Sequence, residues 1–402
     1  MISIGLESFK KTTNTAFLQT GFRPFFLLST GYAVLAMLIW MGVYSFHWDL
    51  SLDGTNHLSW MLWHGHEMIY GYVMAVIAGF LLTAVRNWTK LQTADGKLLL
   101  GLVAFWIIGR IPPLNAPLAY LQAFGDLMFG SLLLLVIAVP IIERKMIRQW
   151  PVLIILSLLL VLNIAFYIDI LGFSDYPLAR NVVYASLYLV LNLIFIFTRR
   201  LIPNFINSAL RLPKPVKNNG IIDKILIPLF LIYSLNQFWL LQQEVAVGLA
   251  AILLVLNGIR LVDWYDKGIW TKHLVWSLYV SYVFLTLGFL LRLGEYFLHY
   301  SSFLTLHMFT VGGIGMITLS MMSRVSFGHT GRNVLKELQA TKWLFYGISL
   351  TVVLRVLLPI FAPQLVIHFI GTAMILWMIT FSVFWVLFFK ILIRKRADGM
   401  YG

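Results

Sequence analysis

Long apolar stretches separated by short polar ones run along almost the whole sequence. A membrane-spanning α-helix needs about 20 mostly apolar residues, and the pattern predicts twelve of them. They cover residues 22–46, 61–85, 97–114, 117–142, 150–171, 178–201, 221–242, 245–262, 273–298, 303–324, 343–362 and 364–393. The predicted fold class is therefore an all-α polytopic membrane protein, with residues 1–402 in one integral membrane domain.

Composition and charge agree with this pattern. The chain is 60% hydrophobic and only 11% charged, whereas soluble proteins average about 25% charged residues. The net charge of +14 comes from lysines and arginines that collect before the first span and after every even-numbered one. The positive-inside rule then places both termini in the cytoplasm, so the basic charge indicates a membrane and not a nucleic acid.

An internal repeat is visible when His66 is aligned with His307. Gly71 then matches Gly312, and the second to fourth spans correspond to the tenth to twelfth. This alignment predicts three four-helix units, residues 1–148, 149–272 and 273–402, in a pseudo-threefold arrangement. Chance similarity among apolar helices is the alternative explanation.

The histidines are distributed unevenly along the predicted topology. Seven of the nine are expected at the outer face, namely His47, His57, His64, His66, His299, His307 and His368; His273 and His329 are expected on the cytoplasmic side. The chain has no cysteine, so any metal ion must use His, Met, Tyr or carboxylate ligands. His66 and His307 are expected at the same depth on two helices, which predicts a haem iron held between them.

His64 and His66 are two residues apart and must point to opposite sides of a regular helix. A second centre, haem or copper, is therefore predicted on the His64 side, where Met68 shares the helix face. Further ligands there could come from His57, His299 or His368. For these three and His47, hydrogen bonding at the headgroup level is the favoured interpretation.

Charged residues near the outer ends of the spans suggest roles around a haem. Arg110, Arg292 and Arg355 could each bind a propionate, although Arg292 could instead form a helix pair with Glu295 or reach the headgroups. Glu67 could relay protons or orient a histidine ligand. The sequence leaves these alternatives open.

These motifs resemble the NnrS family of haem- and copper-containing membrane proteins, which are linked to bacterial nitric oxide metabolism. The matching stretches are GFRPFF (21–26), WHGHEM (63–68), AVIAGFLLTAVRNWT (75–89), IPNF (202–205), LHMFTVGGIGMITLSMMSR (306–324) and GHTGR (328–332). The resemblance implies roles for His64, His66, His307 and His329 as ligands, and for Glu67. One departure is Tyr279, which stands where many members carry a histidine.

The plan of the chain is also similar, more weakly, to the catalytic subunits of haem–copper oxidases and nitric oxide reductases. The leading functional expectation is a bacterial inner-membrane protein that reduces nitric oxide to N2O. One or two b-type haems are expected, with copper as a possible addition and membrane quinol as the electron donor. The alternatives are a nitric oxide scavenger or sensor without turnover, and a transporter of protons or metal ions.

Overall fold

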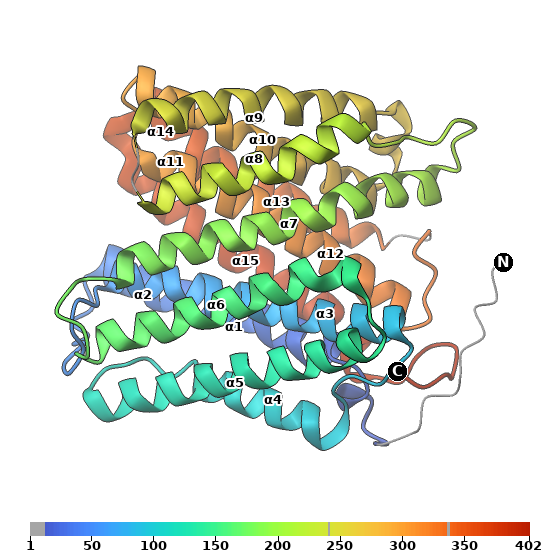
Figure 1. The fold of residues 1–402 in the computed structure, drawn as a ribbon, viewed down its shortest axis with the longest axis horizontal. Helices are drawn as coiled ribbons and strands as arrows, with labels where there is room; N and C mark the ends of the chain where they lie inside the picture. The colour runs from blue at the N-terminus through green and yellow to red at the C-terminus, as the bar shows by residue number, and fades with distance from the viewer. Residues whose placement is uncertain (1–12, 240–241, 336–337) are drawn as a thin grey trace.

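The structure is a computed structural model that describes residues 13–239, 242–335 and 338–402. All regular elements within these ranges are helical. The principal helices are α1 (Phe22–Phe46), α2 (Trp60–His66), α3 (Met74–Thr89), α4 (Gly96–Ile108), α5 (Ala116–Glu143), α6 (Trp150–Ile170), α7 (Ala179–Leu210), α8 (Gly220–Trp239), α9 (Gln243–Trp264), α10 (His273–Phe297), α11 (Ser302–His307), α12 (Met316–His329), α13 (Lys342–Val352), α14 (Leu358–Phe361) and α15 (Val366–Ile393). They lie side by side along one direction (Figure 1).

The expectation of an all-α polytopic membrane protein is confirmed. Within the described ranges, eleven helical segments are long and apolar enough to cross a membrane, and α4 is a twelfth, shorter apolar helix. At a rise of 1.5 Å per residue, the 13 residues of α4 span only about 20 Å. The helix ends before Gly109 and the Pro112–Pro113 pair, because proline lacks the N–H that would extend it.

Side-chain caps fix where two of the helices begin. The Ser59 hydroxyl accepts a hydrogen bond from the Leu62 N–H at 3.3 Å and starts α2. The Asn115 side chain accepts one from the Leu118 N–H at 3.0 Å and starts α5. Such caps satisfy N–H groups that have no partner within the helix, and the first of them sets the level of the histidines in α2.

Three of the long spans are interrupted by π-helical turns. These are η2 (Glu67–Val73), η5 (Met308–Gly315) and η7 (Val353–Leu357). The first two begin directly after His66 and His307, the two residues aligned in the sequence repeat. Isolated π turns in helices are often found at functional sites. The pseudo-threefold arrangement of three units remains a prediction.

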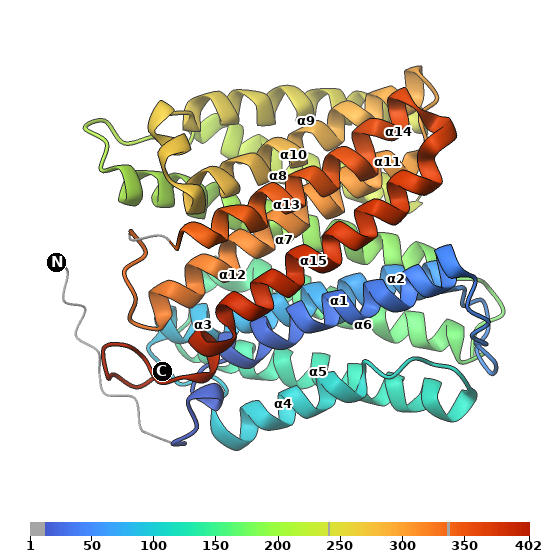
Figure 2. The ribbon, with the colours of Figure 1, turned by 180° about the vertical axis from the view of Figure 1, so that it is seen from behind.

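The first and last long helices of the chain pack against each other. Figure 2 shows α1 and α15 side by side, and the Trp377 Nε1–H of α15 donates to the Ala33 carbonyl of α1 at 3.2 Å. Tyr72 of η2 and Thr318 of α12 share a hydroxyl–hydroxyl hydrogen bond of 2.5 Å. The amino-terminal helices therefore contact the carboxyl-terminal ones directly, and a site between them is built from both ends of the sequence.

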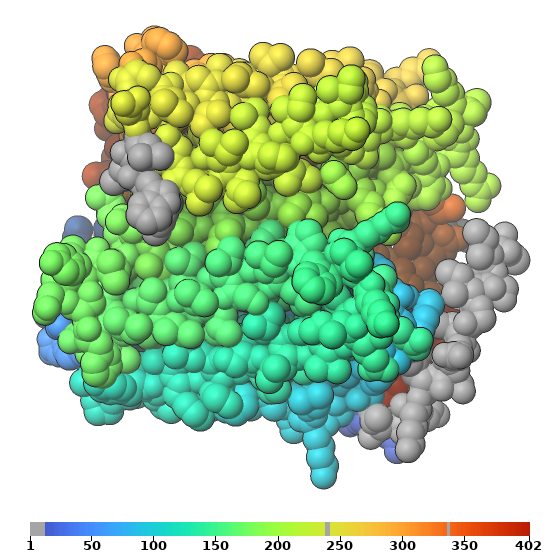
Figure 3. Space-filling model, viewed as in Figure 1, coloured from blue at the N-terminus to red at the C-terminus, as the bar shows by residue number. Residues whose placement is uncertain are grey.

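The outer surface of the bundle suits a lipid environment. Large apolar side chains project from α5, α6 and α9, as in Leu135, Val161 and Val255, each about 60% exposed. Figure 3 shows one broad face with α5 and α6 in its lower part, α9 at its top, and α7 and α8 between them. The structure is thus that of a multi-pass membrane protein.

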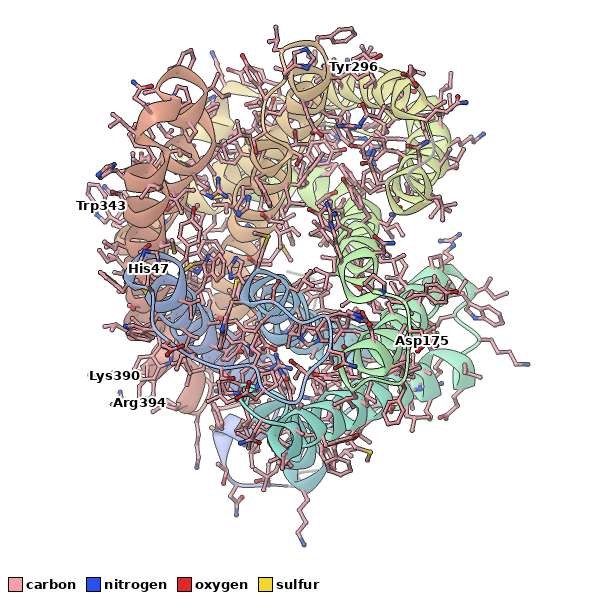
Figure 4. The ribbon with its side chains drawn as sticks, turned by 90° about the vertical axis from the view of Figure 1, so that its left-hand side faces the viewer. His47, Asp175, Tyr296, Trp343, Lys390 and Arg394 are labelled. Atoms are coloured by element: carbon pink, nitrogen blue, oxygen red, sulfur yellow. The ribbon has the colours of Figure 1, made fainter. Side chains whose placement is uncertain are left out.

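The predicted orientation can be tested with single cysteines, because the natural chain has none. We expect Asp175→Cys, in the exposed loop between α6 and α7 (Figure 4), to react with a membrane-impermeant maleimide in intact cells. Lys217→Cys, in the basic loop after α7, should react only after lysis. The reverse labelling pattern would show that the termini face outward.

Candidate functional site

His64 lies on the face of α2 that is turned toward α1. Its ring stacks on the indole of Trp40, with ring centroids 4.9 Å apart and planes inclined by 15°. Its Nδ1 atom is buried and has no hydrogen-bond partner. A buried polar atom without a partner is costly, so this imidazole is suited to receive a ligand or a metal ion.

His307, at the end of α11, is an electrostatic neighbour of His64 from the carboxyl-terminal half of the chain. The two imidazoles interact electrostatically with each other and with Arg355 of η7. The Nδ1 of His307 is 2.7 Å from the Phe303 carbonyl, so Nδ1 carries the hydrogen and Nε2 keeps its lone pair. Nε2 faces the Arg355 guanidinium at 3.3 Å.

The charge of this site is not balanced by protein groups. Arg355 contacts His307 and interacts electrostatically with Tyr44 of α1. No carboxylate of the described residues pairs with it. A guanidinium within a membrane span is expensive without an anion. Two histidines beside an uncompensated arginine therefore fit a group that combines a metal ion with carboxylates.

His66 lies on the opposite side of α2, as the two-residue spacing predicted. Its ring stacks on Phe166 of α6, with ring centroids 4.1 Å apart. Nδ1 is 3.0 Å from Glu67 Oε1, and Nε2 is 2.9 Å from the Asn163 side-chain oxygen. Both ring nitrogens are thus engaged within the amino-terminal helices. The arrangement favours His64 as the partner of His307, and the predicted His66–His307 pair remains untested.

Glu67, Arg110 and Asp126 form a buried ion network next to His66. One arm of the Arg110 guanidinium bonds to Glu67 and another to Asp126. Glu67 also accepts hydrogen bonds from Tyr32 (2.5 Å) and Gln122 (2.8 Å). Arg110 was predicted to hold a propionate, but here its guanidinium is committed to two carboxylates.

The remaining predicted residues lie apart from the His64–His307 site or have other partners. Arg292 pairs with Glu295 at 2.5 Å, which is the helix pair named as the alternative to a propionate contact. His57 pairs with Asp169 at 2.6 Å, and Met68 packs against the hydrophobic core. His47, His299 and His368 are exposed. No set of three or more His, Asp or Glu side chains in the described parts of the chain is grouped for a metal ion.

His329 ends α12, at the far end of the span Ser302–His329 from His307. At 1.5 Å per residue, the 22 positions between them correspond to about 33 Å. Its ring lies 5.9 Å from that of Phe22, and its electrostatic neighbours are Arg396 and Arg86. Tyr279, the departure noted in the sequence, donates to the Leu261 carbonyl at 3.0 Å. Neither residue shares the site of His64 and His307.

Several residues of these two sites were not singled out from the sequence. Trp40 and Tyr44 resemble interfacial aromatic residues of the kind that membrane proteins carry at their surfaces. Gln122, Asn163 and Tyr167 are polar groups within otherwise apolar helices, and Tyr167 donates to Asp126 at 2.7 Å. An isolated amide in an apolar span was the available signal for this buried network.

The fold and the site define a class of protein. It is a helical membrane protein in which two histidines, one from each half of the chain, lie near an arginine that has no carboxylate partner among the described residues. The chain belongs to the NnrS family, whose family model matches residues 16–396. No curated protein matches the sequence significantly. Family membership identifies a membrane protein linked to nitric oxide metabolism.

Proposed function

We propose that this protein binds haem between His64 and His307 and reduces nitric oxide to N2O at that site. The observation that carries the proposal is the arrangement of two imidazoles from opposite ends of the chain beside Arg355. Haem needs axial nitrogen ligands and anion-binding groups for its propionates. These residues provide both.

The donor set fits the group in three respects. The Nδ1 of His64 has no hydrogen-bond partner. The Phe303 carbonyl holds His307 in the tautomer whose Nε2 keeps its lone pair, which now faces the Arg355 guanidinium at 3.3 Å. Arg355 itself has no carboxylate partner among the described residues. The carbonyl is the kind of second partner that orients a histidine ligand. When bound, haem would supply reversible one-electron chemistry and an iron that binds nitric oxide.

The overall reaction joins two NO molecules with two electrons and two protons to give N2O and water. The electrons must come from an external donor, for which membrane quinol is proposed. Glu67 follows His64 by three residues and is held by Tyr32, Gln122 and Arg110. A carboxylate that accepts these bonds is held in its charged form, so we propose that Glu67 orients His66, whose Nδ1 lies 3.0 Å from Glu67 Oε1, instead of supplying the protons. A copper ion, implied by the family resemblance, is a further proposal of the same kind.

Anaerobic turnover of the purified, reduced protein tests this function. We expect nitric oxide consumption to continue past one equivalent per haem, with one N2O formed for every two NO consumed. A protein that binds one equivalent and then stops would be a scavenger or sensor and would contradict catalysis. A colourless protein without haem would favour a transporter.

A further inference from the structure

Basic side chains from distant parts of the chain meet where α1 begins and α12 ends. We call Arg23, Arg86, His329, Arg332 and Arg396 the arginine cluster. Arg23 interacts electrostatically with Arg332 and Arg396, and His329 interacts with Arg86 and Arg396. Figure 2 shows the loop after α15 beside the ends of α3 and α12. The motifs GFRPFF and GHTGR therefore come together at one end of the bundle.

Two of these arginines have no carboxylate side chain as a partner. Arg23 is fully buried and donates to three main-chain oxygens, those of Leu392 (2.9 Å), Arg394 (2.6 Å) and Gly402 (3.0 Å). Arg332 donates to the Thr330 hydroxyl at 2.8 Å. Arg396, in contrast, is paired with Asp398. If Gly402 carried a free carboxylate, it would balance the charge of Arg23 or of Arg332, but not both.

Unsatisfied polar atoms are concentrated in the same place. Arg23 Nε, Thr20 Oγ1 and Ser326 Oγ are all buried without a hydrogen-bond partner. Thr20 and Arg86 both approach Gly402 closely, and the Ser326 carbonyl accepts the Thr330 hydroxyl at 2.6 Å. Buried polar groups in native proteins nearly always have partners, so an additional ligand with several acceptor oxygens is indicated here.

The depth of the cluster limits the kind of ligand. Arg23 is the second residue of α1 and Arg332 follows the end of α12 by three residues, which places both at the membrane surface on the lysine- and arginine-rich side. Arg332 and His329 are only partly buried, and Arg394 and Lys395 are exposed beside them. Basic pockets between helices at this level suit lipid phosphates, and arginine binds phosphate through two parallel hydrogen bonds.

We propose that the arginine cluster binds a phosphate group at the membrane surface, carried by an anionic phospholipid or present as free phosphate. Arg332 and Arg396 form the accessible edge of this site, and Arg23 provides buried positive charge beneath it. The alternative is that the cluster only anchors the segment 394–402 through main-chain contacts. The inference does not depend on the proposed function at His64 and His307.

The test uses the full-length protein, purified in detergent and stripped of lipid. Its thermal midpoint is measured during titration with phosphatidylglycerol, with zwitterionic phosphatidylcholine, and with inorganic phosphate. We expect phosphatidylglycerol or phosphate to raise the midpoint and phosphatidylcholine to leave it unchanged, because ligands of the folded state stabilise it. Arg332→Gln should weaken the apparent affinity about tenfold or more, as expected for lost hydrogen bonds to a charged group.

Arg211→Gln is the matched control, since it removes an exposed arginine from a different basic loop. It should leave the titration unchanged. A response to phosphatidylglycerol alone assigns the site to lipid, and an equal response to inorganic phosphate assigns it to free phosphate. The proposal is wrong if the wild-type protein responds to neither or if the two glutamine variants weaken binding equally. If Arg332→Gln does not fold, Arg332→Lys should still lower the affinity, because lysine lacks the planar fork.

Discussion

Alanine at His64 or His307 is expected to remove haem from the purified protein, whereas alanine at His66 should leave it bound. The first two histidines interact electrostatically with each other and with Arg355, and His66 has both ring nitrogens engaged by Glu67 and Asn163. A histidine ligand cannot be replaced by a methyl group, so the expected loss is nearly complete. The measurement is the haem content per polypeptide together with the optical spectrum of the reduced protein.

His368→Ala provides a control for this series, because His368 is an exposed histidine on α15. It should retain the haem content of the wild-type protein. Expression and thermal midpoint must be compared for every variant, since His66→Ala removes two buried hydrogen bonds and is expected to lower stability. Loss of haem from His66→Ala at unchanged stability, with retention in His64→Ala, would restore the pair inferred from the repeat.

Arg110→Gln is expected to cause a large loss of stability. The guanidinium binds both Glu67 and Asp126, all three groups are buried, and Arg110 also lies against the rings of Tyr32 and Trp106. Without it, two carboxylates are left together in a low-dielectric interior. Removing one member of a buried ion pair costs about 3–5 kcal/mol. The free energy of unfolding in detergent, or the thermal midpoint where unfolding is irreversible, measures this effect.

A triple variant separates the effect of unpaired charge in this network from the effect of lost packing and hydrogen bonds. This variant combines Arg110→Gln with Glu67→Gln and Asp126→Asn. Because none of the three positions then carries a charge, most of the stability lost in Arg110→Gln should return. Arg292→Gln, which affects a partly exposed pair with Glu295, should be milder than Arg110→Gln alone. Equal stability of Arg110→Gln and the wild-type protein would show that the buried network contributes little.

The spans could be predicted because burial in a membrane requires long apolar helices with satisfied backbone groups. The error at α4 is a matter of length. The sequence pattern ran to residue 114, but Gly109 and the following prolines end the helix at Ile108. Apolar content alone does not distinguish a helix from the irregular segment that continues it.

The histidines show what a single sequence can and cannot provide. The opposite directions of His64 and His66 follow from 100° per residue and were correctly predicted. In the structure His64 stacks on Trp40 of α1 and His66 stacks on Phe166 of α6, and the spacing of the two histidines does not specify these neighbours. The repeat matched His66 with His307 by position, and position along a helix does not specify the neighbouring helix.

The partners in the buried charge network could not be predicted either, because they are far apart in the sequence. Glu67 was recognised as an acid near the predicted outer side, but its partner Arg110 is 43 residues away, and Asp126, the second carboxylate on Arg110, is 16 residues beyond that arginine. Contacts between helices that are not sequence neighbours depend on the whole fold. The predicted propionate contact of Arg110 did not anticipate this network.

A density map of the protein purified with its natural cofactors tests the central claim most directly. We expect a planar macrocycle whose iron is bound by His64 and His307, with a propionate against the Arg355 guanidinium. A macrocycle bound through His66 would contradict this claim. So would a map in which the rings of His64 and His307 touch only protein side chains.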